Sequence, residues 1–386
     1  MNKTLLILGA SGSIGSQTLS ILKQNPNDFI LVGFSVGNRT RIITPLIKKY
    51  PSIKAIYVKN YKNFIYYSKK YPSIKFFYGE EGLTQIIDET NPYMMVNALV
   101  GFVGLVPTVH ALKKNIKVAL ANKESLVVGG EVVNDLLAKG YGTLYPIDSE
   151  HSALWKCLKV DDKNVDKLII TASGGAFRNL SRDELDHVTP EDALKHPNWK
   201  MGNKITIDSA TMVNKAFEII EAHYLFNYPI NKIDVILHDE SYIHSMVKYN
   251  SGLYRAEINK PDMRNPIKFA LYEGDISFNT VSSYDYYEFG PYHFHDFNIK
   301  RYPMVKYASL VINKKGTYGA VFNAANEEAV YAFLAKEISF LAIEKIISKL
   351  INTHVKIANP SLEDLIRIDR ETRLTVNRMI EKGEIR

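Results

Sequence analysis

The chain has 386 residues, of which 46% are hydrophobic and 23% charged, and it carries a formal net charge of +7. The length predicts two or three domains, and the composition predicts packed globular cores. The lysines are scattered in short pairs with no clustered basic face, which argues against nucleic acid as a partner. No apolar run reaches about 18 residues, so no transmembrane helix is predicted. We expect a protein that acts on small molecules, including phosphorylated ones, which need only a few local cations.

The single cysteine, Cys157, excludes an internal disulfide and a cysteine-rich metal site, and it favours a reducing compartment. It lies among Leu154, Trp155 and Leu158, so we interpret it as a core residue and not as a nucleophile. The first residues enter a predicted strand without the apolar core of a signal peptide. We therefore expect the cytoplasm, or a plastid-type organelle if a transit peptide has been removed.

The first predicted strand, Thr4–Leu8, runs into a glycine-rich turn and then into a predicted helix, Ile14–Lys23. Strand, glycine turn and helix in this order are the context of a dinucleotide-binding motif. The turn places Gly9, Gly12 and Gly15 three residues apart, whereas the commoner fingerprint is G-x-G-x-x-G. Such a turn can also simply reverse the chain, so both interpretations stay open here.

The second predicted strand, Phe29–Val36, ends in Gly37, Asn38 and Arg39. NAD-specific sites carry Asp or Glu near this place to hold the ribose 2′-hydroxyl, whereas an arginine suits a 2′-phosphate. The sequence therefore favours NADPH over NADH. The alternative is that Arg39 is an ordinary solvated cation.

Short buried strands and helices alternate through the N-terminal part, which predicts an α/β fold with a Rossmann-like parallel sheet. Ligands bind beyond the carboxyl ends of the strands in such sheets. Two polar triplets lie there, Asn122-Lys123-Glu124 and Asp148-Ser149-Glu150. We expect them to line the same crevice as the glycine turn, although each could be a plain polar loop. The predicted strands are Ala55–Val58, Tyr93–Asn97, Lys117–Ala121 and Thr143–Pro146, and the predicted helices include Leu105–Lys114 and Gly130–Lys139.

From Lys167 onward the pattern changes to that of a central α+β domain. A strand at Leu168–Thr171 leads into Ala172-Ser173-Gly174-Gly175, where small residues let backbone N–H groups approach an anion. Residues 279–301 have few helical signals and are predicted to form a surface connection. Further strands are predicted at Asp234–Leu237, Ile243–Tyr249 and Leu253–Ile258, and a helical C-terminal domain at Ala320–Lys336, Leu341–Asn352 and Leu362–Lys382.

An irregular loop precedes the most informative predicted helix. Pro197 and Gly202 argue against regular structure in this loop. His196 and Trp199 are more typical of a lid over a site than of a linker. We therefore expect both side chains to close over a bound ligand.

The helix after this loop is predicted to begin at Ala210, with its N-cap at Asp208–Ser209. At about 100° per residue, Asn214, Lys215 and Glu218 share one side, and the apolar residues face the other. The helix N-terminus and the serine hydroxyl suit a phosphate. The alternative is that the polar side is the solvent-facing side of an ordinary amphipathic helix.

Three carboxylates stand out as candidate metal ligands: Asp148, Glu150 and Glu218. The first two are two residues apart and could point the same way from an extended segment. Three oxygen ligands without cysteine suit Mg²⁺ or Mn²⁺, with Co²⁺ as a further candidate, and leave positions open for substrate or water. The alternative is that these carboxylates cap a helix or pair with lysine.

Eight segments occur in order along the chain: LGASGSIG, LANKESLV, PIDSEHSALWKCL, TASGGAFR, HPNWKMGNKITIDSATMVNK, IHSMV, PDMR and NAANE. Together they resemble the 1-deoxy-D-xylulose 5-phosphate reductoisomerase family of the methylerythritol phosphate route to isoprenoids. The resemblance runs from the first strand to the C-terminal helices. It implies a homodimer whose chain has an NADPH-binding domain at 1–148, a catalytic domain at 149–274 that binds metal and substrate, a linker at 275–305 and a C-terminal helical domain at 306–386.

The resemblance also implies an oxidoreductase that uses NADPH and a divalent metal to rearrange and reduce 1-deoxy-D-xylulose 5-phosphate to 2-C-methyl-D-erythritol 4-phosphate. The implied metal ligands are Asp148, Glu150 and Glu218, and Lys123 and His196 complete the catalytic set. The implied cofactor contacts are Ser11, Gly12, Ser13, Ile14, Gly37, Asn38, Arg39, Asn122, Glu124, Gly202 and Met263. The implied substrate contacts are Lys123, Ser149, Glu150, Ser173, His196, Trp199, Ser209, Asn214, Lys215 and Glu218.

The chain departs from the usual family pattern at Ala216, at Lys260 and at Tyr272-Glu273-Gly274, where a glycine, a small residue and a Trp-Pro pair are common. None of these departures removes a predicted ligand, although the last two affect the predicted shape near the linker and the nicotinamide. Two rival functions stay open. One is a plain NADPH dehydrogenase without rearrangement, which a product analysis would reveal. The other is a noncatalytic NADPH-binding regulator, which should have lost metal or phosphate ligands, and none is missing.

Overall fold

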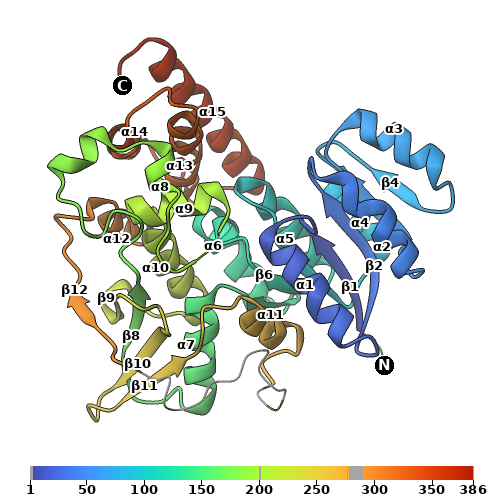
Figure 1. The fold of residues 1–386 in the computed structure, drawn as a ribbon, viewed down its shortest axis with the longest axis horizontal. Coiled ribbons are helices and arrows are strands. Elements are labelled where there is room, and N and C mark those ends of the chain that lie inside the picture. Colours follow the sequence, from blue (N-terminus) through green and yellow to red (C-terminus); the bar gives the residue numbers. More distant parts are fainter. Residues whose placement is uncertain (1–2, 200, 276, 278–289, 386) are drawn as a thin grey trace. The chain divides into compact units, whose positions relative to one another are not determined.

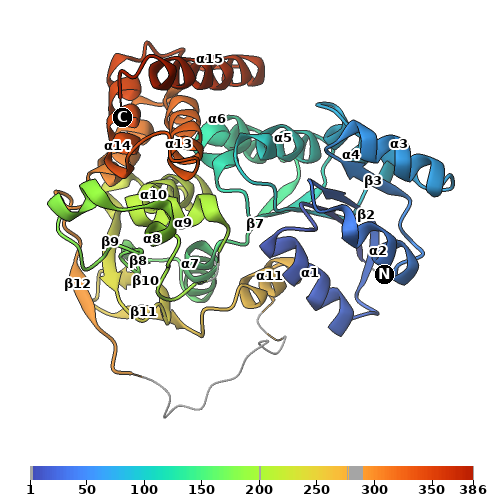
Figure 2. The ribbon, with the colours of Figure 1, turned by 45° about the horizontal axis from the view of Figure 1, so that its top comes forward.

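The computed structural model describes residues 3–199, 201–275, 277 and 290–385, and the chain divides into two compact units (Figures 1 and 2). No helix in these ranges combines the length and the hydropathy that crossing a bilayer requires. The first unit contains Met1–Ser125, Val132–Asp148 and Met263–Val281, and the second contains Leu126–Glu131, Ser149–Asp262 and Ser282–Arg386.

A seven-stranded parallel sheet forms the centre of the first unit, in the order β4-β3-β2-β1-β5-β6-β7. The order reverses between β1 and β5, the kind of switch point at which doubly wound sheets bind ligands. The predicted Rossmann-like sheet is thereby confirmed. Its strands are β1 (Lys3–Leu8), β2 (Phe29–Val36), β3 (Ala55–Val58), β4 (Lys75–Phe77), β5 (Met94–Asn97), β6 (Lys117–Leu120) and β7 (Thr143–Pro146).

Helices connect these strands, as the alternating pattern predicts. They are α1 (Ser13–Gln24), α2 (Ile43–Lys49), α3 (Tyr61–Lys70), α4 (Gly82–Thr90), α5 (Leu105–Lys113) and α6 (Glu124–Ala138). The edge strand β4 is missing from the sequence prediction, because only one of its three residues is buried and no apolar pattern marks it. In contrast, β5 is buried at every residue, as parallel strands covered on both faces should be.

Helix α11 (Arg264–Leu271) belongs to the first unit, where it packs against α1, β6 and β7 (Figure 2). The predicted domain boundary at residue 274 places this helix with the catalytic domain instead. The pattern of a helix shows that it has an apolar face, but not which partner covers that face. The division into four segments stays a prediction, and residues 276 and 278–289 of the predicted linker lie outside the described residues.

Glu273 anchors the end of α11 to the first sheet. Its carboxylate accepts hydrogen bonds from Lys3 Nζ (2.7 Å), Lys117 Nζ (2.6 Å), Tyr93 Oη (2.5 Å) and Tyr145 Oη (3.2 Å). Burial opposes ionisation of this carboxyl, but the hydrogen bonds from the two lysines outweigh it and lower the pKa of Glu273 to about 2. In this chain Glu273 lies in the segment where the family usually has a Trp-Pro pair, and its hydrogen bonds connect this segment to the first sheet.

A five-stranded mixed sheet in the order β11-β10-β8-β9-β12 lies in the second unit. Strand β8 (Val165–Ala172) runs parallel to β9 (Ile233–His238) and antiparallel to β10 (Ile243–Tyr249). Helix α7 (Ser149–Val160) packs against β10 and the edge strand β11 (Tyr254–Ile258). These features confirm the predicted α+β domain. Strand β12 (Phe294–Asp296) lies inside the predicted connection and escaped prediction because its residues are all exposed.

Two helices replace the single helix that the sequence predicts from Ala210. They are α9 (Asn203–Thr211) and α10 (Val213–Phe226), and Met212 separates them with a left-handed backbone (φ +62°). The N-cap prediction at Asp208–Ser209 is therefore wrong, since both residues lie near the end of α9. The error arose because glycine or asparagine usually occupies a left-handed position, and a methionine there gives no sequence signal.

The C-terminal part is helical, as predicted. Its helices are α12 (Lys306–Lys314), α13 (Tyr318–Leu334), α14 (Phe340–Thr353) and α15 (Leu362–Glu381), with the short α8 (Pro190–Ala193) earlier in the same unit. Helix α13 packs against both α14 and α15. Ser361 and Asp364 form the expected capping box at the start of α15.

Candidate active site

The glycine turn of the first unit lies at the end of β1, next to the switch point. Gly9 has φ +86°, and a Cβ there would lie 2.4 Å from the carbonyl oxygen of Ala98, so only glycine fits. A Cβ on Gly15 would similarly lie 2.3 Å from the oxygen of Gly9. Helix α1 begins at Ser13 with Gly12 as its N-cap and no side-chain cap. The turn thus presents helix N–H groups at a place that suits the phosphates of a dinucleotide.

Arg39 lies beside this turn, at the end of the neighbouring strand β2. Its Nη1 donates a hydrogen bond of 3.5 Å to the carbonyl oxygen of Ser11, and the side chain is exposed. Asn38 is exposed as well, and Gly37 is partly buried. The structure therefore brings together the two segments that the sequence assigns to the cofactor.

The side chain of Asn122 is occupied by hydrogen bonds within the first unit. Its Nδ2 donates to Leu99 O (3.0 Å), Gly101 O (2.9 Å) and Glu124 Oε2 (3.0 Å), and its Oδ1 accepts from Ser125 N (3.1 Å). A contact to a cofactor must therefore come from its main chain or replace one of these bonds. The side chain itself fixes the loop between β6 and α6.

Lys123 forms an ion pair of 2.7 Å with Asp148, and both side chains are nearly buried. The two residues follow β6 and β7, whose carboxyl ends lie at the same edge of the sheet. Asp148 is the last residue of the first unit and is followed directly by Ser149, the first residue of α7. The sequence predicts an extended segment through Glu150. The structure instead shows a helix that begins one residue after Asp148.

In the second unit, Glu150 and Glu218 approach the same ammonium group, that of Lys215. Its Nζ donates to Thr171 O (2.6 Å) and to a Glu218 carboxylate oxygen, and lies 3.7 Å from Glu150 Oε1. Asn214 Nδ2 donates to the other Glu218 oxygen at 2.5 Å. Lys215 is 4% exposed and Glu218 is 1% exposed. These burials exclude the alternative of a solvent-facing helix side.

The chemistry of this group fits a hard divalent cation. Glu150 and Glu218 offer carboxylate oxygens from α7 and α10, and Asp148, two residues before Glu150, offers a third. Ser149 Oγ donates to Glu150 Oε2 at 2.5 Å, which orients that carboxylate. Carboxylate oxygens are the ligands that Mg²⁺ and Mn²⁺ prefer, whereas softer metals prefer the sulfur of Cys or Met.

His196 lies in the predicted loop and forms a hydrogen bond with Ser173. Its Nδ1 accepts hydrogen bonds from the backbone N–H groups of Asn198 (3.2 Å) and Trp199 (3.0 Å), so the ring proton is on Nε2. Nε2 in turn donates to Ser173 Oγ at 3.1 Å. Burial, with a smaller contribution from the Arg178 charge, lowers the pKa of His196 to about 4. The imidazole is therefore neutral at physiological pH.

Ser209 is 8% exposed and lies against the Ser173-Gly174-Gly175 turn. Gly175 has φ +72°, and a Cβ there would lie 2.7 Å from the carbonyl oxygen of Ser209. The structure thus brings together two segments predicted to bind substrate.

Two of the predicted cofactor contacts fall in different units. Gly202 is an exposed N-cap of α9 in the second unit, whereas Met263 packs against the hydrophobic core of the first unit.

Family models match three parts of the chain: 1-deoxy-D-xylulose 5-phosphate reductoisomerase at residues 5–130, its C-terminal domain at 144–226, and the DXP reductoisomerase C-terminal domain at 258–375. The 1-deoxy-D-xylulose 5-phosphate reductoisomerase of Bacillus cereus (strain AH187) is 45% identical over 380 residues, which span 98% of this chain and 100% of that protein. The chain belongs to the 1-deoxy-D-xylulose 5-phosphate reductoisomerase family. The resemblance stated from the sequence is confirmed.

Solved reductoisomerase structures share the whole fold. The enzyme from Zymomonas mobilis, in complex with NADPH, has a TM-score of 0.89 at 35% identity and spans 99% of this chain and 100% of its own. A DOX-P reductoisomerase in complex with NADPH, fosmidomycin and magnesium has a TM-score of 0.91 at 32% identity, with 98% of each chain covered. The chain is an NADPH- and divalent-metal-dependent oxidoreductase that converts 1-deoxy-D-xylulose 5-phosphate in isoprenoid synthesis.

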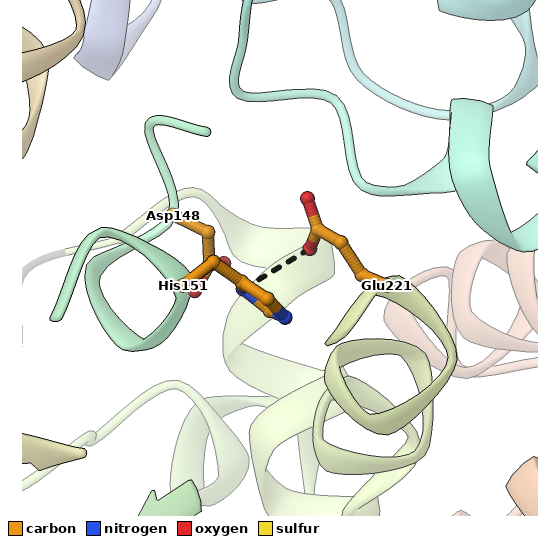
Figure 3. Close-up of side chains that lie close together, drawn as sticks. All are labelled: Asp148, His151 and Glu221. Carbon is orange, nitrogen blue, oxygen red and sulfur yellow. Dashed lines mark ion pairs between the residues drawn. The ribbon is translucent and has the colours of Figure 1, made fainter. Parts of the chain in front are cut away.

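The chain also has two buried residues beside the candidate metal ligands that the sequence prediction does not include. His151 follows Glu150 on α7, and Glu221 lies three residues after Glu218 on α10. Figure 3 shows them with the ion pair between them, from His151 Nδ1 to Glu221 Oε2 at 3.4 Å. The spacing could have drawn attention to Glu221, because residues three apart share a helix face, whereas His151 directly follows Glu150 and gives no such signal.

Proposed function

We propose that the chain rearranges and reduces 1-deoxy-D-xylulose 5-phosphate to 2-C-methyl-D-erythritol 4-phosphate, with Asp148, Glu150 and Glu218 as ligands of Mg²⁺ or Mn²⁺. The observation that supports the ligand assignment is the convergence of Glu150 and Glu218 on one buried cation, the Lys215 ammonium. Buried carboxylates are costly unless a cation faces them, so their position is tied to positive charge.

The cofactor contacts proposed for NADPH lie mostly in the first unit. The N-terminus of α1 and the glycine turn would hold the pyrophosphate, and Arg39 the 2′-phosphate of the adenosine ribose. The remaining proposed contacts are those of Ser11, Ser13, Ile14, Gly37, Asn38, Asn122, Glu124, Gly202 and Met263. NADPH supplies the hydride that reduces the rearranged aldehyde.

The reacting oxygens of the substrate would lie near Lys123, Ser149 and Glu150. A bound divalent ion supplies Lewis-acid stabilisation of the enolate-like charge that develops while a carbon–carbon bond breaks and re-forms. Lys123 adds a fixed positive charge in a site with little water, where such charges act most strongly. The chain's own task is to hold these groups before the reaction begins.

The phosphate of the substrate would be bound by Ser173, Ser209, Asn214 and Lys215. The sequence predicts a helix N-terminus at Ser209 that would help to bind the phosphate. Ser209 instead lies near the end of α9, so no helix N-terminus is available there. Lys215 instead offers an ammonium, which donates to Thr171 O and to the Glu218 carboxylate in this structure. We infer that Lys215 turns from the Glu218 carboxylate to the phosphate when that carboxylate takes up a metal ligand's role.

His196 and Trp199 would close over the substrate, which excludes water from the reacting centre. The neutral His196 ring donates from Nε2, so it can offer a hydrogen bond without adding charge. We further propose a homodimer in the cytoplasm. The buried thiol of Cys157, whose pKa is raised to about 11 by burial, fits a reducing compartment and no catalytic role.

The experiment that tests this function is to incubate the pure protein with 1-deoxy-D-xylulose 5-phosphate, NADPH and Mn²⁺ and to identify the product by NMR. The expected product carries the branched carbon skeleton, with one NADPH consumed per molecule. A reduced but unbranched product would support the plain dehydrogenase. Absence of turnover, with NADPH still bound, would support the noncatalytic regulator.

A further inference from the structure

His151 is fully buried on α7 and meets α10 at three points. Its Nε2 lies 2.9 Å from the backbone carbonyl oxygen of Glu218, and its Nδ1 lies 3.4 Å from Glu221 Oε2. Its ring also stacks on Phe226, with 6.3 Å between ring centroids. Figure 3 shows the ring directed from α7 toward the Glu221 carboxylate. One side chain therefore ties the start of α7 to most of the length of α10.

These contacts run alongside the candidate metal ligands. Glu150 and His151 are consecutive in the first turn of α7, and Glu218 and Glu221 are three residues apart on one face of α10. Two connections thus join the same two helices: Glu150 to Glu218 through Lys215, and His151 to Glu221. Because the helices are stiff, the second connection fixes the distance across which the carboxylates of the first connection face each other.

The chemistry of the pair makes the contact specific. Nε2 faces a carbonyl oxygen and must donate to it, while Nδ1 faces a carboxylate. At 3.4 Å this is an ion-pair contact between two buried side chains. Glu221 is only 1% exposed, and such a buried carboxylate is stable beside a partner of this kind. A pair of apolar residues could fill the space but could not pull the two helices to this spacing.

We propose that His151 and Glu221 are positioning residues that set the separation of Glu150 and Glu218, and through it the affinity for the divalent cation. The proposal rests on the function proposed above, in which these carboxylates hold the metal. Groups that orient metal ligands without touching the ion typically change metal affinity or activity by about 10- to 100-fold when they are replaced.

The test measures the dissociation constant of Mn²⁺ by electron paramagnetic resonance on the full chain without substrate. Glu221→Gln should raise this constant roughly 10- to 100-fold. Turnover should recover at saturating Mn²⁺, while NADPH affinity stays unchanged. The control is Glu344→Gln, which removes another buried carboxylate of the second unit, one that pairs with Arg182 away from α7 and α10.

The double variant His151→Phe with Glu221→Leu separates positioning from mere stability. It replaces both polar partners by apolar groups that can still pack on Phe226, so the thermal midpoint should stay near that of the parent. Its Mn²⁺ affinity should remain weak if the pair positions the ligands. Parental Mn²⁺ affinity in the double variant, or in Glu221→Gln, would overturn the proposal. A parent chain that binds no Mn²⁺ at all would instead refute the proposed metal site.

Discussion

Charged side chains that are buried away from solvent make up much of the candidate active site. Lys215 and Glu218 are almost inaccessible, and Lys123 and Asp148 nearly so. Each such charge is stable only beside an opposite one, which fixes where a cation or an anion can bind. The sequence could place Asn214, Lys215 and Glu218 on one helix side but could not show that this side is buried. Periodicity tells which residues share a face and not what covers it.

Arg39 is expected to decide between the two nicotinamide cofactors. A charge-assisted hydrogen bond is worth about 1.5–3 kcal/mol, so Arg39→Ala should weaken NADPH binding roughly 10- to 100-fold and leave NADH binding nearly unchanged. The exposed neighbour Arg41 is a matched control, and Arg41→Ala should alter neither constant. Fluorescence titration measures both. Equal losses for NADPH and NADH would remove Arg39 from the phosphate site.

His196 should remain neutral at pH 7 with its proton on Nε2. Its folded pKa of about 4 lies below the ordinary value of 6.5, so the unfolded loop takes up protons first as the pH falls. Stability of the loop around residues 174–199 is therefore complete above about pH 6.5 and declines toward pH 4. Nitrogen NMR of labelled histidine reports the tautomer and the midpoint. A charged ring at pH 6, or a proton on Nδ1, would contradict this assignment.

Whole elements were predictable wherever an apolar pattern was long enough. The strands at Phe29–Val36, Ala55–Val58 and Ile243–Tyr249 have the predicted bounds, because their residues are buried in succession or in alternation. The break between α9 and α10 was not predictable, since Met212 adopts a left-handed backbone without glycine. That break moves Ser209 away from a helix start, which changes how a phosphate can be bound there.

The anchoring of α11 by Glu273 makes a prediction about stability. Glu273→Gln keeps the shape but removes the charge that faces Lys3 and Lys117, so the first unit should lose about 1–2 kcal/mol at pH 7. The folded pKa of about 2 lies below the unfolded value of about 4.3, so this stabilisation is present above that value and disappears as the pH falls toward 2.

Thermal denaturation at a series of pH values measures this loss. The difference between parent and variant should close as the pH falls from about 4.5 to 2. Glu89→Gln, which breaks the exposed pair with Lys75, is the matched control and should shift the midpoint little at any pH. A variant that loses nothing at pH 7 would show that α11 is held by its apolar face alone.

At the scale of the whole molecule, the chain builds each unit from separated segments. The second unit inserts residues Ser149–Asp262 between two parts of the first, and α11 returns to the first sheet. The sequence predicted the order of the folds, because that order follows from local patterns. It could not predict the return of α11, since a contact between segments more than a hundred residues apart leaves no local trace.

Glu218, together with Asp148 and Glu150, is proposed to hold the divalent ion on which the reaction depends. The most direct test of this proposal is a titration of Mn²⁺ into Glu218→Gln, followed by turnover with 1-deoxy-D-xylulose 5-phosphate and NADPH. Glutamine keeps the shape of the side chain but removes the negative charge that a hard cation needs. We predict that Mn²⁺ affinity and turnover both fall sharply, while NADPH affinity survives because its proposed contacts lie elsewhere. Near-parental Mn²⁺ affinity and turnover would contradict the proposed metal site.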